Sequence, residues 1–223
     1  MKKDSNSMDK VVHIVYKFRD CLYAIELFDG LNDVKILHLC LAFLCKVKGD
    51  GFISQEDEKE LQFYSVKSRF NLPESIYEIR SVCGNQLDKV LADAADSVIY
   101  QHQLKAGLRG GEFIQPRELT ELVLALVKEK DCKTIYNPFA GMASYGLADF
   151  DCSYYGQEIN RSIYNLAKMR LVLHGVNPVN FTNCDCLENR IELGFDCVLS
   201  SPPFGGRLSP EIRLETGVTT YDE

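Results

Sequence analysis

The 223-residue sequence has little positive charge, and this limits how it could contact nucleic acid. It holds 25 lysines and arginines against 32 aspartates and glutamates, a formal net charge of -7. A domain that binds DNA without help usually has a basic balance. Any contact with DNA is therefore expected through a local basic patch or through a basic partner subunit.

The nine cysteines include no C-x-x-C pair, the spacing typical of a structural zinc site. They are also too few and too irregularly spaced for a disulfide scaffold in a chain of this length. We therefore expect reduced, buried thiols and a cytoplasmic location. His13, His38 and His102 have no companion at ligand spacing, so structural or surface roles are expected and no metal site.

Long apolar runs are missing as well. The longest, residues 36–44, is interrupted by His38, whereas a helix that spans a bilayer needs about 20 apolar residues. The sequence therefore predicts no membrane-spanning segment.

The first 106 residues contain helical patterns of apolar side chains. Residues 10–28 place their apolar positions on one face, and residues 34–47 are apolar on most sides, as in a central helix. Further helices are expected at residues 56–69, 75–82 and 85–100. Glycine is enriched around residues 107–111, where we place the boundary between a helical N-terminal domain, 1–106, and a second domain, 107–223.

The second domain alternates short strand patterns with helices. The strands are expected at residues 133–136, 153–157, 179–182 and 197–199, with helices at residues 116–130 and 160–175 and another after residue 144. This alternation predicts an α/β fold with a parallel, doubly wound, Rossmann-like sheet.

The ends of these strands carry residues suited to a cofactor. The turn from Asn137 to Ser144 is built of small residues, which let the backbone approach a ligand closely, although Gly141 alone does not make a dinucleotide fingerprint. Glu158 lies 17 residues after Gly141 and could hold ribose hydroxyls or simply begin a helix. Asp185 could accept from an adenine amine or cap a turn.

The fourth strand must end at Ser201-Pro202-Pro203-Phe204, because proline lacks a backbone N–H and fixes φ. The prolines hold the Ser201 carbonyl and hydroxyl at the strand end, with Phe204 just beyond. A rigid acceptor beside an aromatic ring suits a planar, amine-bearing base taken out of a nucleic-acid stack. The alternative is an ordinary strand-end turn.

This segment resembles the Asn/Asp/Ser-Pro-Pro-Tyr/Phe motif of amino-methyltransferases. Residues 111–117, 137–144, 155–160, Asp185 and 201–204 follow one another in a specific order. In that order, residues 107–206 resemble the modification subunit of type I restriction-modification systems, in the N6-adenine DNA methyltransferase family.

The resemblance implies S-adenosylmethionine as the methyl donor, and DNA, a DNA-specificity subunit and a restriction subunit as partners. It implies that Glu158 binds the cofactor's ribose and Asp185 its adenine. The residues that would border the methionine part are Phe113, Ile114, Gln115, Pro116, Arg117, Asn137, Ala140, Gly141, Ala143 and Ser144. The residues that would position the target amine are Ser201, Pro202, Pro203 and Phe204.

Three departures leave alternatives open. Gln115 stands where the family often has threonine, and Ser201 where it usually has asparagine. Serine there is common among cytosine-N4 methyltransferases, and the motif is shared with enzymes that act on RNA or on protein glutamine. The sequence also ends at Glu223, before the family's further strands. A fragment is expected, completed by a second chain or serving as a non-catalytic assembly module.

Overall fold

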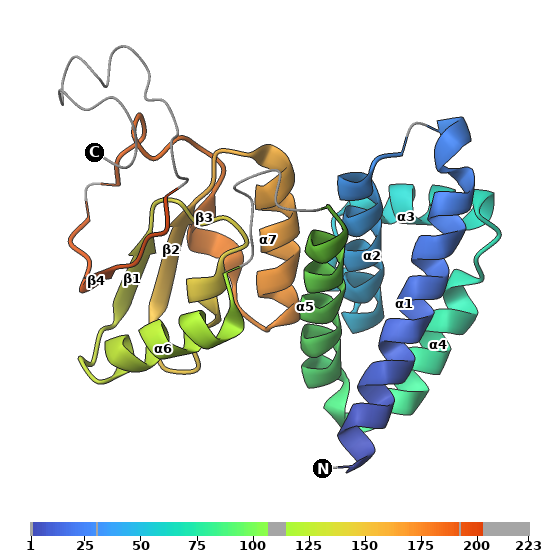
Figure 1. The fold of residues 1–223 in the computed structure, drawn as a ribbon, viewed down its shortest axis with the longest axis horizontal. Coiled ribbons are helices and arrows are strands. Elements are labelled where there is room, and N and C mark those ends of the chain that lie inside the picture. Colours follow the sequence, from blue (N-terminus) through green and yellow to red (C-terminus); the bar gives the residue numbers. More distant parts are fainter. Residues whose placement is uncertain (1, 30, 107–114, 192, 203–223) are drawn as a thin grey trace. The chain divides into compact units, whose positions relative to one another are not determined.

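The computed structural model describes residues 2–29, 31–106, 115–191 and 193–202 (Figure 1). The chain divides into two compact units. Unit 1 comprises Met1–Gly107 with Lys168–Asn177, and unit 2 comprises Leu108–Ala167 with Pro178–Glu223. In the described part of the chain, no helix combines the length and the apolar character that crossing a membrane requires.

Unit 1 is helical. Its elements are α1 (Lys2–Asp29), α2 (Asp33–Lys48), η1 (Asp50–Phe52), α3 (Gln55–Lys67), α4 (Leu72–Cys83), η2 (Gly84–Gln86) and α5 (Leu87–Ala106), with the end of α7. Helix α2 is buried on most sides, as its apolar composition predicts. In the core of unit 1, the rings of Phe18, Phe43 and Phe70 pack edge-on or tilted, with centroids 4.8–5.6 Å apart.

Side-chain caps set where three of these helices begin. The side chains of Asn32, Ser54 and Asn71 accept hydrogen bonds from the backbone N–H groups three residues later, at the starts of α2, α3 and α4. Helix α1 instead begins at Lys2, well before the apolar pattern that starts near residue 10. The polar first turns extend a helix whose later turns are anchored by buried side chains such as Val11.

Unit 2 is built on a parallel sheet. Its strands are β1 (Thr134–Asn137), β2 (Ser153–Gln157), β3 (Phe181–Thr182) and β4 (Cys197–Val198), in the order β3-β2-β1-β4 (Figure 1). Helices α6 (Arg117–Lys128) and α7 (Arg161–Leu173) precede β1 and follow β2. The parallel α/β prediction is confirmed. Because all four strands are parallel, their carboxyl ends meet at one edge of the sheet.

Two local predictions were wrong. The turn after β1 leads into a short 3-10 helix, η3 (Ser144–Leu147), and not into an α-helix. The chain leaves η3 in an extended conformation at Ala148 and enters β2 at Ser153, which leaves no room for α-helical turns. Strand β3 is also shorter than expected, because Pro178–Asn180 forms the 3-10 helix η4 and proline cannot donate to a strand ladder.

The two faces of the sheet are covered differently. On one face, Tyr164 of α7 packs on Phe181 with ring centroids 4.9 Å apart, beside Tyr154. On the other, Phe195 stacks on Tyr136 at 4.7 Å and lies 5.1 Å from Tyr155. Parallel sheets are normally covered on both faces, and here the segment between β3 and β4 supplies part of that cover.

Gly156 allows β2 to pack against its aromatic neighbours. A Cβ atom at this position would lie 2.8 Å from Cδ2 of Phe181 and 2.8 Å from the hydroxyl oxygen of Tyr154. We expect Gly156→Ala to lower the free energy of unfolding by about 1–3 kcal/mol, the usual cost of overpacking. Urea unfolding measures this, with Gly51→Ala as the control because its Cβ would meet nothing within 4 Å. Equal stabilities of the two variants would contradict the packing argument.

Candidate functional site

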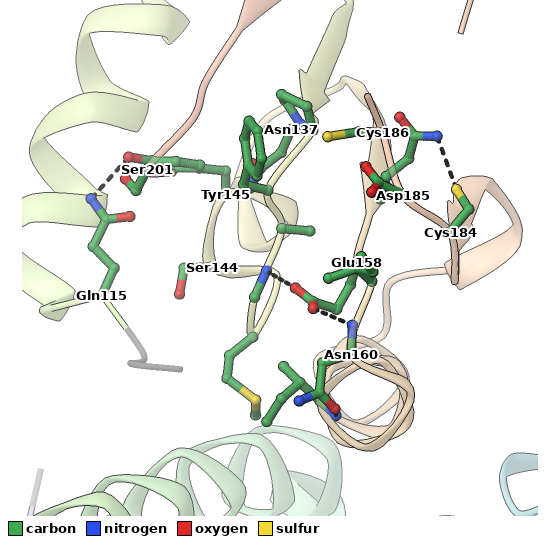
Figure 2. Close-up of a pocket in the computed structure, with 18 residues that line it drawn as sticks. Gln115, Asn137, Ser144, Tyr145, Glu158, Asn160, Cys184, Asp185, Cys186 and Ser201 are labelled. Atoms are coloured by element: carbon green, nitrogen blue, oxygen red, sulfur yellow. Dashed lines mark hydrogen bonds between the residues drawn. The ribbon is translucent and has the colours of Figure 1, made fainter. Parts of the chain in front are cut away.

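A cavity of about 330 Å³ opens at the carboxyl edge of the sheet in unit 2. Its lining comes from Gln115 just before α6, the turn after β1, the β2–α7 junction, the segment after β3, and Ser201 (Figure 2). Open α/β sheets bind their ligands at this edge, and the volume falls in the range of small-molecule sites.

The turn after β1 brings backbone close to the cavity. Ala140 donates its N–H to the Gln157 carbonyl at 2.9 Å, which ties the turn to β2. Gly141 has φ of 51° and Ala143 has φ of 56°, so both lie in the left-handed region that side chains disfavour. At the end of β1, Asn137 is only 3% exposed, and its Oδ1 has no hydrogen-bond partner among the described residues. A buried, unsatisfied acceptor that lines a cavity indicates a ligand donor.

Glu158 joins this turn to the start of α7. One carboxylate oxygen accepts the Gly141 N–H at 2.8 Å and the other accepts the Asn160 N–H at 2.7 Å (Figure 2). Asn160 in turn caps α7 by accepting from the N–H groups of Ser162 and Ile163. The carboxylate is thus held in one orientation at the cavity wall before any ligand arrives.

Asp185 lies in the segment after β3. Its Oδ1 accepts the Leu187 N–H at 2.9 Å, and its other carboxylate oxygen has no partner among the described residues. The Asn183 side chain donates to the Glu158 carbonyl at 2.7 Å, so the segments that carry the two acids are tied together. Two acids from successive strand ends therefore line one cavity.

Gln115 and Ser201 line the same cavity from other segments (Figure 2). The Gln115 side-chain amide donates to the Tyr145 hydroxyl at 2.9 Å, which connects the segment before α6 to η3. Ser201 is exposed and Pro202 half-buried at the end of the segment that follows β4. Ser201, the first residue of the predicted Ser-Pro-Pro-Phe segment, thus lines the same cavity as Glu158.

The structure brings together eight of the residues predicted from the sequence. The cavity lining includes Gln115, Asn137, Ala140, Gly141, Ser144, Glu158, Asp185 and Ser201. It does not include Pro116, Arg117, Ala143 or Pro202. Arg117 pairs with Glu121 along α6 at 2.6 Å instead, and Ala143 is fully buried. Phe113, Ile114, Pro203 and Phe204 lie outside the described residues.

Several lining residues were not predicted, notably Tyr145, Gln157, Asn160 and the pair Cys184 and Cys186. Cys186 is buried, and burial raises the pKa of its thiol to about 12. It is therefore protonated at neutral pH and forms part of the wall without acting as a nucleophile. Gln157 lies within the 155–160 segment of the resemblance, but neither it nor Tyr145 was assigned a role, because their contacts come from segments distant along the chain.

A second polar cluster lies in unit 1. His38 Nε2 is 2.7 Å from Asp57 Oδ1, and Glu60 lies close enough for the three side chains to share an ion. Lys35 also pairs with Glu60. A cation already neutralises that carboxylate, so we interpret the cluster as an ion-pair network between α2 and α3. The sequence had shown no companion for His38.

Comparison with known proteins places the chain in a family. The family model described as N-6 DNA methylase matches residues 86–216, more than half of the chain. The chain is 32% identical to the type I restriction enzyme MpnII methylase subunit of Mycoplasma pneumoniae, in a match covering 54% of this chain and 26% of that subunit. It is 27% identical to the MjaIX methylase subunit of Methanocaldococcus jannaschii, over 44% of this chain and 20% of the relative.

Solved structures support the fold. A Listeria monocytogenes protein described as a class I S-adenosylmethionine-dependent methyltransferase superposes with a TM-score of 0.70 at 14% identity, covering 98% of this chain and 65% of that one. The methyltransferase subunit of a type I restriction-modification system from Streptococcus thermophilus gives 0.52 at 19% identity, over 97% and 63%. The chain thus spans about a quarter of the curated relatives it matches and under two thirds of these structures. On the extent of the family match, together with this fold, the chain belongs to the N-6 DNA methylase family.

Proposed function

We propose that this chain forms the S-adenosylmethionine-binding part of an adenine-N6 DNA methyltransferase subunit of a type I restriction-modification system. One observation carries the proposal. A single cavity at the carboxyl edge of the sheet gathers Asn137, Glu158 and Asp185 together with Ser201, the first residue of the Ser-Pro-Pro-Phe segment. Family membership supports the reaction, and the resemblance of residues 107–206 supports the system.

The hydrogen-bond acceptors that line the cavity fit S-adenosylmethionine. Each Glu158 oxygen accepts an N–H, and a carboxylate oxygen can accept a further hydrogen bond, which suits a ribose hydroxyl. Asp185 has a carboxylate oxygen without a described partner, which suits the adenine amine. The buried Asn137 Oδ1 suits the ammonium of the methionine part. When bound, the cofactor supplies a methyl group activated by its sulfonium.

The chain's own contribution to transfer is positioning. The Ser201 hydroxyl and the Pro202 carbonyl accept hydrogen bonds from the target amine, which orients its nitrogen toward the methyl group. The same acceptors stabilise positive charge as it develops on that nitrogen. Cavity walls such as Met142 and Ile163 exclude water from the cofactor.

DNA and the other subunits enter as proposed partners. With a net charge of -7, the chain relies on a basic partner subunit to hold the phosphate backbone. A DNA-specificity subunit fills this role in our proposal, and a restriction subunit completes the system. We propose adenine N6 as the target atom on the strength of the family match.

Titration calorimetry with S-adenosylmethionine tests the proposal on the intact chain. We expect saturable heat with one site, and Asn137→Leu to weaken binding about tenfold because the ligand's ammonium loses a buried acceptor. Ser201→Ala is the matched control, since it lies on the substrate side and should change cofactor affinity by less than about twofold. Absence of heat at millimolar ligand would reject the cofactor assignment.

The target is tested separately. The chain is incubated with single-stranded DNA and labelled S-adenosylmethionine, and the digested nucleosides are separated by mass spectrometry. N6-methyladenine supports the proposed target, and N4-methylcytosine overturns it. Cofactor binding without any methylated base would identify a binding and assembly role for the chain alone.

A further inference from the structure

We propose that Gln157 is a positioning residue that sets cofactor specificity by holding the segment Cys184–Asn189, and with it Asp185, against the sheet. This inference rests on the proposed function, because it names what controls the adenine end of the same cavity. Gln157 is the last residue of β2, is 2% exposed, and lines the cavity beside Glu158.

The orientation of the Gln157 amide follows from its partners. Its Nε2 donates to the backbone carbonyl of Asn189 at 2.8 Å and to Cys184 Sγ at 3.0 Å. Because a carbonyl can only accept, the NH2 group must face Asn189 and the amide oxygen must face the other way. That oxygen accepts a hydrogen bond from the Tyr136 hydroxyl on β1.

The Tyr136 hydroxyl is a reliable donor. Burial, with smaller contributions from Cys186 and Cys184, raises its pKa to about 12, so it stays protonated throughout the neutral range. The buried amide is therefore satisfied at both ends, by β1 on one side and by the segment after β3 on the other.

Asp185 lies between the two anchor points of this amide. Cys184 precedes it, and Asn189 donates its backbone N–H to the Asp185 carbonyl at 2.8 Å, which closes a tight turn. The Asn189 side chain also donates to that carbonyl, at 3.2 Å. Loss of the Gln157 donor would release the turn at both ends and leave the Asn189 carbonyl without this hydrogen bond.

Displacement of Asp185 is expected to affect recognition of one part of the ligand, the adenine amine. Asp185 offers an acceptor for the adenine amine, while Glu158 and Asn137 contact other parts of the cofactor in our proposal. A displaced Asp185 therefore reduces discrimination at the C6 position of the purine more than it reduces overall binding. A side chain that only supported the fold would weaken all ligands in parallel.

The experiment compares S-adenosylhomocysteine with S-inosylhomocysteine, in which an oxo group replaces the amine, by calorimetry on the intact chain. We expect the unmodified chain to prefer the adenosyl ligand about tenfold or more, the value of a charge-assisted hydrogen bond. Gln157→Met should reduce the preference to within about threefold. Tyr136→Phe, which keeps the Gln157 donor, is the matched control and should retain most of it.

The outcomes separate the inference from the proposed function. A folded Gln157→Met variant that keeps the full preference overturns the inference. If the methionine variant does not fold, Gln157→Glu takes its place, because it keeps size and polarity but lacks the donor, and full preference in that variant overturns the inference as well. In an Asp185→Ala background, Gln157→Met should cause no further loss of preference, and a further loss would also overturn it. Failure of the unmodified chain to bind either ligand would reject the proposed function instead.

Discussion

Glu158→Ala is expected to weaken S-adenosylmethionine binding about a hundredfold, the largest effect on binding that we expect from a single substitution in the cavity. The carboxylate accepts the N–H groups of Gly141 and Asn160 and, in our proposal, the ribose hydroxyls. Loss of two charge-assisted hydrogen bonds at about 1.5 kcal/mol each corresponds to about two orders of magnitude in Kd.

A graded series makes this result specific. Glu158→Gln keeps one acceptor oxygen and should lose about tenfold, because one N–H contact and the charge are removed. Glu188→Ala is the control, since Glu188 is an exposed acid on the segment after β3 and does not line the cavity. Calorimetry gives the affinities and thermal unfolding shows whether each variant is folded. If the Glu158→Ala chain binds S-adenosylmethionine as tightly as the unmodified chain, Glu158 does not contribute to cofactor binding.

The sheet was predictable because local signals agreed with the tertiary structure. The expected strand at residues 153–157 coincides with β2 (Ser153–Gln157), and the one at residues 133–136 is displaced from β1 by a single residue. Both strands contain buried residues and are bounded by polar residues, a pattern typical of strands in a sheet that is covered on its faces. The prediction failed at two places. Pro178 begins the 3-10 helix η4, which leaves β3 shorter than expected. Ala143 adopts a left-handed conformation, and the short 3-10 helix η3 follows it in place of the expected helix.

Part of the site could be predicted for a topological reason. Parallel strands end at one edge, so acids within a few residues of a strand end, such as Glu158 and Asp185, are expected to line the same cavity. Gln157 and Tyr145 gave no such signal. A glutamine inside a strand has no distinctive spacing, and its partners Cys184 and Asn189 lie 27 and 32 residues further along the chain. Only the fold shows that its amide is buried and shared between segments.

Two polar networks among the described residues of unit 1 were likewise not predictable from the sequence. His38 and Asp57 are 19 residues apart and meet because α2 and α3 pack together. Asp96 and Arg170 are 74 residues apart and meet within unit 1. Neither pair follows from sequence spacing, and the second is buried enough to matter for stability.

Asp96→Asn should lower the free energy of unfolding at neutral pH by about 3 kcal/mol, the usual cost of breaking a buried ion pair. Asp96 Oδ1 lies 2.7 Å from Arg170 Nε and 3.2 Å from His174 Nε2. The Arg170 side chain is 6% exposed, so the substitution removes the carboxylate from beside a buried guanidinium.

The pH dependence provides a second signature. Burial raises the Asp96 pKa, but the neighbouring His174 and the charge and hydrogen bond of Arg170 outweigh it and lower the pKa from 3.8 to about 2. A carboxyl whose pKa is lower in the folded state stabilises the fold above its unfolded pKa and loses that contribution as the pH falls. The contribution is at most about 2 kcal/mol and disappears between about pH 4 and pH 2.

Urea unfolding followed by circular dichroism, from pH 6 to pH 2, measures both effects on the intact chain. The difference between the unmodified chain and Asp96→Asn should be largest above pH 4 and should shrink toward pH 2, because only the unmodified chain loses the charged carboxylate. Asp93→Asn is the matched control on the same helix. Asp93 pairs with Lys89 at the surface at 2.8 Å, so its loss should cost about 0.5 kcal/mol or less. A difference for Asp96→Asn that stays constant down to pH 2 would show that packing, and not the charge of Asp96, stabilises this part of unit 1.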